Sequence, residues 1–455
     1  MTSSWLRRRP FIVCAAALAV ANAPFWLLGH AFFMSRAMVN VDLALALATL
    51  CVWPWLGSIL LALAWATDLV VSQSLTFHFG TPVEFLRSFR FAAALRIDDF
   101  LHWSQLLLAL PFAIGAVALR ILVVRKRSLW PYMLALAAAL VLFDTVNGSS
   151  QLSDRSTWRM PYNVAGSPTS NLLTLQARGD QPGELRAVPV AETAQGLIDI
   201  PQWAAAHPGR GIMLVIVESL GAPVEAELRQ WLDERMIDDS IEQGFRAVST
   251  DLPFRGSTTA GELRTLCALL GSYRGLDATT GATCLPSRLR QLGWTTIGLH
   301  GFSRRMFDRE TWWPGIGLQE SHFIDSPSFG KGPLCGSTFR GACDETLLGI
   351  AARRLEEGNR FVYALTLNTH LPLVPTTVPP DLGDICRKTA TPQEVCELVA
   401  ALGTVLHRTR ELATQVRPAP LLLVLGDHAP PFALRTSRAL FQQGLVPAYI
   451  LIPRE

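Results

Sequence analysis

The sequence predicts an N-terminal bundle of about five membrane-spanning helices, followed by a C-terminal α/β domain with a mainly parallel central sheet. Two observations lead to this fold class. Half of the 455 residues are hydrophobic and only 17% are charged, whereas an ordinary soluble protein has roughly 25% charged residues. The long apolar segments all precede residue 147, and after residue 211 short apolar runs alternate with helix-like segments.

Four apolar blocks before residue 147 account for the membrane prediction. They cover residues 11–34, 39–71, 101–124 and 129–143. Because a bilayer takes about 20 apolar residues per helix, the second block is too long for a single span. The sequence Pro54–Gly57 offers a break inside that block. We therefore expect five helices within residues 1–147.

Basic residues at two places set the expected orientation. Arg7–Arg9 precede the first block, and Arg125–Arg127 separate the last two. Basic loops stay in the cytoplasm, so four crossings join the two clusters and a fifth carries the chain outside. A cleaved signal peptide is the alternative for the first block, but that block is long and lacks a clean small-residue cleavage site. We predict a linker at the membrane surface over residues 148–210 and an extracytoplasmic domain over residues 211–455.

Six of the eight cysteines lie in the predicted outside part. Pairing neighbours along the chain would join Cys267 to Cys284, Cys335 to Cys343 and Cys386 to Cys396, one of many connectivities that six cysteines allow. A zinc site is the rival interpretation, but the sequence contains no Cys-x-x-Cys pair. Disulfides need an oxidising compartment, so the cysteines favour a periplasmic type of environment.

Four apolar runs in the C-terminal part are expected to be strands. They cover residues 212–217, 295–299, 361–367 and 421–425. Continuous apolar strands suit a sheet that is covered on both faces. Helix-like segments alternate with them over residues 222–239, 260–270, 285–292, 343–357 and 392–415. This alternation is typical of an α/β domain with a mainly parallel sheet.

Polar residues follow each of these runs. Glu218 comes after the first, His300 after the second, Asn368–His370 after the third and Asp427–His428 after the fourth. In open α/β sheets the functional site lies at the carboxyl ends of the strands. Any one of these residues could be a loop residue or a helix cap. Four strands that end in metal-ligand or acid–base residue types together indicate a site.

The segment Ser257–Glu262 begins a predicted helix. Thr259 and Glu262 have the spacing of a capping box, so one interpretation is that these residues only start the helix. A hydroxyl at this place would also lie where backbone N–H groups and the helix dipole favour a phosphate. A metal ion bound to the Thr258 hydroxyl would make it a nucleophile near neutral pH.

Taken in order, the motifs resemble a known family. They are Glu218–Leu220, Gly256–Thr258, His300 with Phe307 and Arg309, Asn368–His370, and Gly426–His428. This set resembles the lipoteichoic acid synthase type of phosphotransferase, which sits beside the phosphoglycerol and phosphoethanolamine transferases in the alkaline phosphatase and sulfatase superfamily. The resemblance covers essentially the whole chain. It implies that the C-terminal part is an alkaline phosphatase-like, or sulfatase-like, catalytic domain.

The resemblance implies a metal site and a nucleophile. One divalent ion would be held by Glu218, Thr258, Asp427 and His428. Oxygen and imidazole ligands suit Zn²⁺ or Mn²⁺, with Mg²⁺ as a further option. Thr258 would be the nucleophile that becomes phosphorylated, and Thr259 is the alternative because the two threonines are adjacent.

The resemblance also implies residues that contact the substrate. His300 and His370 would touch the transferred phosphate or protonate a leaving group. Arg309 would hold the phosphate head group, and Phe307 stands where the family pattern has a tryptophan. Taken alone, Arg309 lies between two acidic residues and could be a solvated charge, and His370 precedes a Leu-Pro pair and could only shape a turn.

The implied reaction moves a phospholipid head group, phosphoglycerol or phosphoethanolamine, through a phosphothreonine to a glycan or glycolipid acceptor. It would take place outside the bacterial cytoplasmic (inner) membrane, where a multi-pass anchor in the bilayer keeps the site near its lipid donor. Water as the acceptor would make the chain a phosphodiesterase, and an inactive membrane scaffold is the non-enzymatic alternative. The net charge of +3 is too small to indicate a nucleic-acid partner.

A second enzymatic interpretation comes from the segment Cys284–Arg288. It fits the Cys-x-Pro-x-Arg signature of sulfatases, in which the cysteine becomes formylglycine. Sulfatases usually follow their first strand with paired aspartates, whereas here Glu218 is followed by Ser219. Thr258 also fills the helix start that the modified cysteine would occupy, and Cys284 has a candidate disulfide partner in Cys267. A sulfatase is therefore the second choice.

Overall fold

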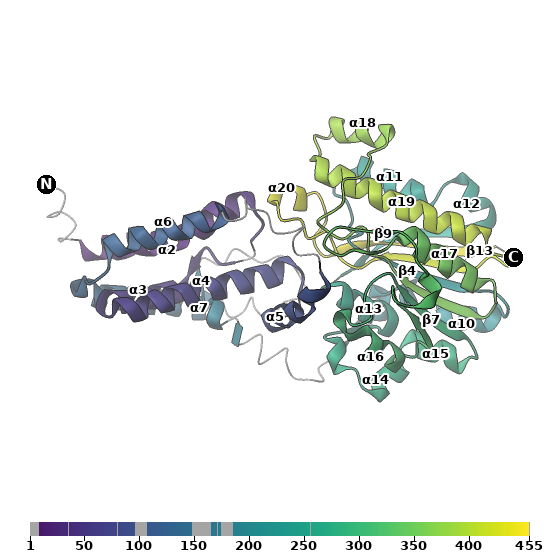
Figure 1. Cartoon of the computed structure of the whole chain (residues 1–455), viewed down its shortest axis with the longest axis horizontal. Coiled ribbons are helices and arrows are strands. Elements are labelled where there is room, and N and C mark those ends of the chain that lie inside the picture. The colour runs from purple at the N-terminus through teal and green to yellow at the C-terminus, as the bar shows by residue number, and fades with distance from the viewer. Residues whose placement is uncertain are drawn as a thin grey trace. The chain divides into compact units, whose positions relative to one another are not determined.

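The structure is a computed structural model of the chain, shown in Figure 1. It describes residues 9–34, 36–79, 81–95, 107–147, 165–170, 172–173, 185–254 and 256–454. The chain forms two compact units: Met1–Arg87 with Leu101–Gln181 and Ala433–Arg435, and Ser88–Phe100 with Pro182–Phe432 and Thr436–Glu455. Several predicted features lie outside the described residues: Arg7, Arg8, the start of the block 101–124, and residues 148–164 of the linker.

The first unit contains the apolar helices. Those described are α2 (Pro10–Ala31), α3 (Val41–Val52), α4 (Pro54–Thr76), α5 (Pro82–Ser88), α6 (Leu110–Leu122) and α7 (Trp130–Asn147). By length and composition, α2 and α4 can cross a membrane. A third span results if Leu107–Leu122 and Arg127–Phe143, which are bent by 95°, count as one broken helix. The described residues thus give two or three spans, and the expected count of five is not confirmed.

The expected break at Pro54 is present. α3 ends at Val52 and α4 begins at Pro54, and proline is well tolerated at the first position of a helix. α3 has 12 residues, which at the rise of an α-helix span about 18 Å, less than the ~30 Å hydrocarbon core of a bilayer. The second apolar block therefore forms two helices, and the first of them is shorter than an ordinary span.

The second unit is built on a seven-stranded sheet with the order β5-β13-β12-β4-β11-β7-β8. The strands are β5 (Phe245–Pro253), β13 (Leu445–Pro453), β12 (Leu421–Gly426), β4 (Ile212–Val217), β11 (Arg360–Leu365), β7 (Thr295–His300) and β8 (Glu320–His322). β12, β4, β11, β7 and β8 pair in parallel, whereas β13 is antiparallel to both of its neighbours. The sheet is therefore mixed, and the expected mainly parallel sheet is not confirmed as such.

Helices cover both faces of this sheet (Figure 1). α11 (Ala226–Met236), α17 (Asp344–Leu355) and α19 (Gln393–Gln415) pack together on one face, and α10 (Ile200–Ala206), α13 (Thr258–Cys267) and α15 (Leu285–Gln291) on the other. Every residue of β4 and β12 is buried. The continuous apolar runs are thus strands of a doubly covered sheet, as the sequence predicts.

Part of the predicted linker contributes to the second unit. In α10, Ile200 and Trp203 are buried and belong to its hydrophobic core. β3 (Arg186–Ala187) pairs with β6 (Leu269–Leu270) directly after α13. The folded unit therefore includes residues that precede position 211.

Three disulfides join the cysteines of the second unit. They are Cys267–Cys284, Cys335–Cys343 and Cys386–Cys396. The pairing of neighbours along the chain is thus confirmed. The first disulfide ties α13 to the start of α15, so it connects the helix that carries Thr258 to the segment that resembles a sulfatase signature.

Candidate metal and nucleophile site

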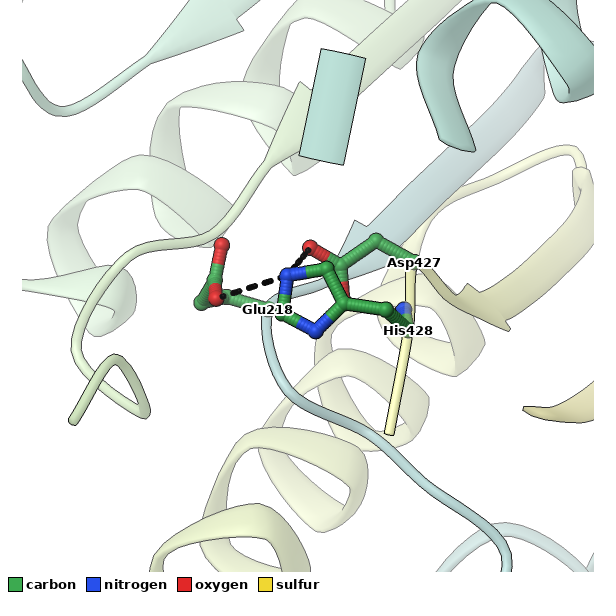
Figure 2. Close-up of side chains that lie close together, drawn as sticks. All are labelled: Glu218, Asp427 and His428. Atoms are coloured by element: carbon green, nitrogen blue, oxygen red, sulfur yellow. Dashed lines mark hydrogen bonds and ion pairs between the residues drawn. The ribbon is translucent and has the colours of Figure 1, made fainter. Parts of the chain in front are cut away.

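Three buried side chains converge at the carboxyl ends of the two central strands (Figure 2). Glu218 directly follows β4, and Asp427 and His428 directly follow β12. Because β4 and β12 are adjacent and parallel, their ends meet at the same edge of the sheet. One ligand atom from each residue lies within 4.8 Å of the others. This is the geometry of a possible metal site.

Asp427 is held rigidly by its backbone surroundings. Its Oδ1 accepts hydrogen bonds from the backbone N–H groups of Ser219 and His428, at 2.9 and 2.7 Å. Its Oδ2 is buried, has no hydrogen-bond partner within the described part of the chain, and lies 3.3 Å from Nε2 of His428. Burial, together with the nearby charge of Glu218, raises the pKa of Asp427 to about 7. A cation would relieve both the burial cost and the repulsion.

The His428 ring is oriented for ligation through Nε2. Its Nδ1 lies 3.0 Å from the carbonyl oxygen of Ala429, which favours a proton on Nδ1. The lone pair of Nε2 then points toward Glu218 Oε1, at 3.6 Å, and toward Asp427. A second ring nitrogen bonded to a backbone carbonyl is the usual arrangement for metal-binding histidines.

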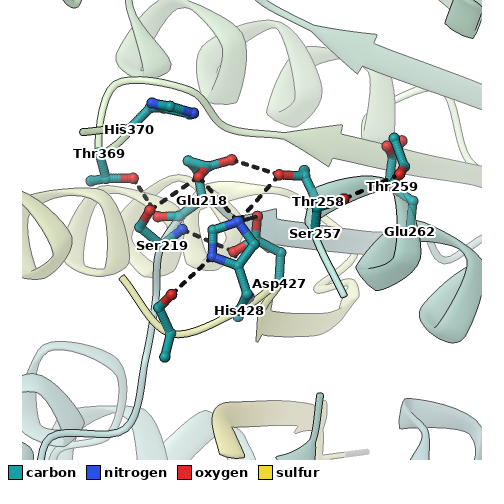
Figure 3. A network of polar contacts seen from close by, with 12 residues as sticks. Glu218, Ser219, Ser257, Thr258, Thr259, Glu262, Thr369, His370, Asp427 and His428 are labelled. Atoms are coloured by element: carbon teal, nitrogen blue, oxygen red, sulfur yellow. Dashed lines mark hydrogen bonds and ion pairs between the residues drawn. The ribbon is translucent and has the colours of Figure 1, made fainter. Parts of the chain in front are cut away.

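Thr258 adds a hydroxyl to this cluster (Figure 3). It is the first residue of α13. Its Oγ1 donates to Glu218 Oε2 at 3.1 Å and lies 3.4 Å from His428 Nε2. The N-cap residue Ser257 makes no side-chain capping bond. The first turn of α13 therefore offers N–H groups beside the Thr258 hydroxyl, where a phosphate would be stabilised.

Gly261 allows α13 to approach the cluster closely. A Cβ atom at this position would lie 3.1 Å from both Cα and Cβ of Asp427. Real Cβ atoms rarely come this close to another residue. A glycine one turn after Thr258 therefore lets the helix pack directly on the loop that carries two of the candidate ligands.

The capping box, one of the two interpretations of Thr259 and Glu262, does not form. Glu262 is fully buried and accepts hydrogen bonds from Arg309, from Trp313 Nε1 at 3.0 Å and from the Tyr363 hydroxyl at 3.1 Å. A side chain held by three donors in the core does not reach back to the helix start. The contact recorded for the Thr259 hydroxyl is with Ser257 Oγ, at 3.5 Å, and is not with the cluster.

Arg309 begins α16 (Arg309–Gly315) and is buried, so it is not a solvated charge. Its guanidinium lies 2.8 Å from Glu262 Oε2 and also donates to the Met306 carbonyl at 3.3 Å. The Phe307 ring lies 5.5 Å from this guanidinium. The contacts described for Arg309 are thus internal to the domain, and its role in holding a head group stays a prediction.

His300 comes from β7 and His370 from the loop after β11, and both strands lie on the side of β4 opposite β12. His300 ends β7, and its Nδ1 lies 3.1 Å from the Leu365 carbonyl. Burial and the charge of Arg309 hold the pKa of His300 well below its ordinary value. His370 Nδ1 lies 2.6 Å from the Leu371 carbonyl, and burial lowers the pKa of His370 to about 4. Both rings are therefore neutral at pH 7.

Some supporting residues escaped the sequence analysis. The Ser219 hydroxyl donates to Glu218 Oε1 at 3.0 Å, the Thr369 hydroxyl donates to the Glu218 carbonyl, and the Glu218 N–H donates to Thr366 Oγ1 at 3.0 Å (Figure 3). Ser219 and Thr369 lie inside motifs that the sequence singled out, so their positions, although not their roles in holding Glu218, could be found from the sequence.

Asp344 gave no signal in the sequence. It is the first residue of α17, and its carboxylate accepts the backbone N–H groups of Leu367 and Asn368, both at 2.9 Å. The Asn368 side chain accepts the Asp344 N–H in return, at 2.6 Å. Burial raises the pKa of Asp344 to about 7. This exchange of bonds fixes the loop that leads to His370.

Cys284 lies at the start of α15 and is bonded to Cys267. A sulfur in a disulfide is not the free thiol from which formylglycine is made. Cys284 is also not a member of the cluster of Glu218, Asp427 and His428. The structure therefore gives no support to the sulfatase interpretation.

Comparisons with known proteins give structural matches only. No protein-family model matches the chain, and no curated protein matches it significantly. Lipoteichoic acid synthase LtaP from Listeria monocytogenes is similar to 55% of this chain, at 16% identity and a TM-score of 0.41, and the match spans 66% of that protein. The chain thus covers slightly less than two-thirds of this first match.

Two further solved structures are similar. Phosphoglycerol transferase GacH from Streptococcus pyogenes, in complex with sn-glycerol-1-phosphate, matches 56% of this chain and 73% of its own, at 14% identity and a TM-score of 0.39. Lipooligosaccharide phosphoethanolamine transferase A (EptA) from Neisseria meningitidis matches 89% of this chain and 78% of its own, at 12% identity and a TM-score of 0.46. The type of protein that the motifs resemble is thus among these matches, but likeness at this level does not assign a function.

Proposed function

We propose that this chain transfers a phospholipid head group, phosphoglycerol or phosphoethanolamine, through a phosphorylated Thr258 to a hydroxyl of a glycan or glycolipid. The observation that carries the proposal is the position of Thr258 Oγ1, 3.1 Å from Glu218 Oε2 and 3.4 Å from His428 Nε2 at the start of α13. One hydroxyl thereby lies both among candidate metal ligands and at a helix N-terminus that favours phosphate.

The donor set fits one divalent ion, Zn²⁺ or Mn²⁺, with Mg²⁺ as a further option. The residues that would hold it are Glu218, Thr258, Asp427 and His428. Among the described residues the buried Asp427 Oδ2 accepts no hydrogen bond, and it lies 3.3 Å from His428 Nε2; this geometry supports the assignment. When bound, such an ion would lower the pKa of the threonine hydroxyl and offset the charge of the two carboxylates.

In the first step, Thr258 Oγ attacks the head-group phosphorus. The Oγ–phosphorus bond forms while the bond from phosphorus to the diacylglycerol oxygen breaks, and that oxygen takes up a proton from water as diacylglycerol leaves. The threonine proton passes to Glu218 Oε2, to which the hydroxyl already donates. The N–H groups of the first turn of α13 stabilise the phosphate oxygens.

In the second step, an acceptor hydroxyl attacks the phosphothreonine. His370 is neutral at pH 7 and its Nδ1 faces the Leu371 carbonyl, so its Nε2 suits acceptance of the proton from that hydroxyl. His300 has the same arrangement, with Nδ1 at the Leu365 carbonyl. Thr258 Oγ regains the proton held by Glu218 Oε2 as its bond to phosphorus breaks, and the proton on His370 passes to water, which restores the starting protonation.

The proposal includes a membrane topology. The chain would cross the cytoplasmic membrane five times, place the catalytic unit outside, and take its lipid donor from the outer leaflet. In the part of the chain that the structure describes, two helices are long and apolar enough to cross a membrane, which supports an anchor, and the three disulfides support an oxidising side.

Intact mass of the purified full-length chain tests the intermediate. The metal-loaded protein is incubated with vesicles of phosphatidylglycerol or phosphatidylethanolamine. We expect the intact chain to gain the mass of phosphoglycerol or phosphoethanolamine. After digestion the added mass should lie on the peptide that contains Thr258, and Thr258→Ala should show no adduct. Thr259→Ala is the matched control and should keep the adduct.

Three results would point elsewhere. A chain with bound metal that forms no adduct with either lipid contradicts the transferase proposal. An adduct that decays equally fast with and without glycan indicates a phosphodiesterase. Formylglycine at Cys284 would establish the sulfatase interpretation.

A further inference from the structure

A segment that lies between membrane helices in the sequence belongs to the catalytic unit. Residues Ser88–Leu95 begin at the last residue of α5 and include the short 3₁₀ helix Phe89–Ala94. Phe91 is only 8% exposed and lies in an apolar cluster. The buried members of this cluster are Phe91, Phe302, Met306 and Leu367. A phenylalanine from the membrane half of the sequence is thus part of a small apolar cluster of the catalytic unit, separate from its main core.

This cluster borders both histidines of the candidate site. Phe302 follows His300 by two positions, and their ring centres lie 6.4 Å apart. Leu367 accepts the backbone N–H of His370 at 3.0 Å. The Phe339 ring lies 6.0 Å from Phe302 and 3.8 Å from His370. Packing in the cluster therefore bears directly on the orientation of the two imidazoles.

Residues 88–95 also contact a strained turn, which lies within residues 302–308. Phe307 and Asp308 are consecutive non-glycine residues with φ of 53° and 54°, a conformation that persists only where the surroundings hold it. The Phe307 ring centre lies 5.4 Å from that of Phe91. The Asp308 carboxylate forms an ion pair with Arg90 and accepts the Tyr273 hydroxyl at 2.8 Å. Each strained residue thus has a partner in residues 88–95.

We propose that residues 88–95 are a positioning element of the catalytic site, an inference that rests on the proposed function. Phe91 and Arg90 hold the turn 302–308 in place. Through that turn and Leu367 they orient the two histidines that would meet the phosphate and the acceptor. Phe91 itself does not touch the substrate. A segment that lies between apolar helices in the sequence thereby completes the catalytic unit to which it belongs.

Hydrogen exchange of the full-length protein tests the positioning without turnover. Phe91→Ala should accelerate amide exchange in peptides that cover residues 301–309 and 366–371, and leave β4 and β12 unchanged. Phe91→Leu, which keeps a large apolar side chain, should exchange like the wild type. Phe89→Ala is the matched control, because Phe89 lies in the same short helix with 59% of its surface exposed. Unchanged exchange of both peptides in Phe91→Ala overturns the proposal.

Head-group transfer from vesicles gives the second readout. We expect Phe91→Ala to lower kcat by about 10- to 100-fold with less than about a twofold change in KM, since small misplacements at a site have effects of this size. Phe91→Leu should restore most of kcat. An unchanged kcat in Phe91→Ala, or an equal loss in Phe89→Ala, contradicts the positioning role. If the wild type transfers no head group while the exchange differences occur, the proposed function fails and the positioning stands.

Discussion

The guanidinium of Arg309 lies 2.8 Å from the Glu262 carboxylate, and the two side chains are 2% and 0% exposed. This ion pair links α16 to α13, the helix that begins with Thr258. Trp313 and Tyr363 complete the hydrogen bonds of the carboxylate. Arg309 is therefore first a structural partner of the helix that carries the candidate nucleophile.

Arg309→Ala should lower the free energy of unfolding of the protein. Removal of one partner leaves the Glu262 carboxylate buried and unpaired, at a cost of about 3–5 kcal/mol. Thermal or denaturant unfolding of the full-length protein measures this effect. Arg305→Ala is the control, since Arg305 is exposed on the same turn. Equal stability of the two variants, with a raised KM only for Arg309→Ala, would instead indicate a role in head-group binding.

Gly261→Ala should weaken metal binding. The added Cβ would lie 3.1 Å from Cα and Cβ of Asp427, so either α13 or the Asp427 loop must shift. Changes beside a metal ligand typically reduce affinity by about 10- to 100-fold. Calorimetric titration with Mn²⁺ and Zn²⁺ measures the loss. In the control Gly349→Ala, the new Cβ would meet only the flexible end of Arg353, at 3.7 Å. If both variants bind metal equally well, the close approach of α13 is not needed for the site.

His370 should make stability depend on pH. Burial lowers its pKa from the ordinary value of 6.5 to about 4. Between these two values the folded protein binds fewer protons than the unfolded chain. The stability from the neutral ring is thus fully present above pH 6.5 and is lost as pH falls toward 4.

His370→Gln should reduce this loss of stability. Unfolding free energies at pH 7.5 and 5 measure the difference. His300 has a pKa shift in the same direction, so the dependence should shrink and should not vanish. If the free energy of unfolding falls by the same amount between pH 7.5 and 5 in the wild type and in His370→Gln, the His370 ring is not buried in its neutral form.

Replacement of both Cys267 and Cys284 by serine should lower stability without removing the chemistry. The disulfide closes a loop with a sequence separation of 17, and loss of such a cross-link costs about 2–4 kcal/mol. The difference in unfolding free energy between the oxidised wild type and the double variant measures this loss of stability. Adduct formation at Thr258 should persist. Complete loss of adduct in a folded double variant would mean that Cys284 has a role beyond the disulfide.

The strand ends were predictable because β4 and β12 are buried on both faces, so each is a continuous apolar run that stops where the strand ends. Glu218, Asp427 and His428 each follow such a strand directly. The predicted helices agree with α15, α17 and α19 within a few residues, since the apolar runs between polar loops mark them. The disulfide pairing followed from short separations along the chain.

Other features depend on contacts between distant residues. Arg309 lies between two acidic neighbours, which suggested a solvated charge, but its partner Glu262 is 47 residues away. β5 is only partly buried, so it has no continuous apolar run. The count of five spans is not confirmed among the described residues, because α3 is shorter than an ordinary span and the α6–α7 region is bent by 95°.

The segment Ser88–Leu95 limits how the chain can be threaded through a bilayer. Arg90 and Asp308 are 218 residues apart in the sequence and form an ion pair within one compact unit, so both must lie on the same side of the membrane. In the proposed topology, the chain between them then crosses an even number of times. Five spans arranged as three before this segment and two after it satisfy that parity. Counting the bent pair Leu107–Leu122 and Arg127–Phe143 as one crossing does not, so the proposed topology requires that pair to cross twice.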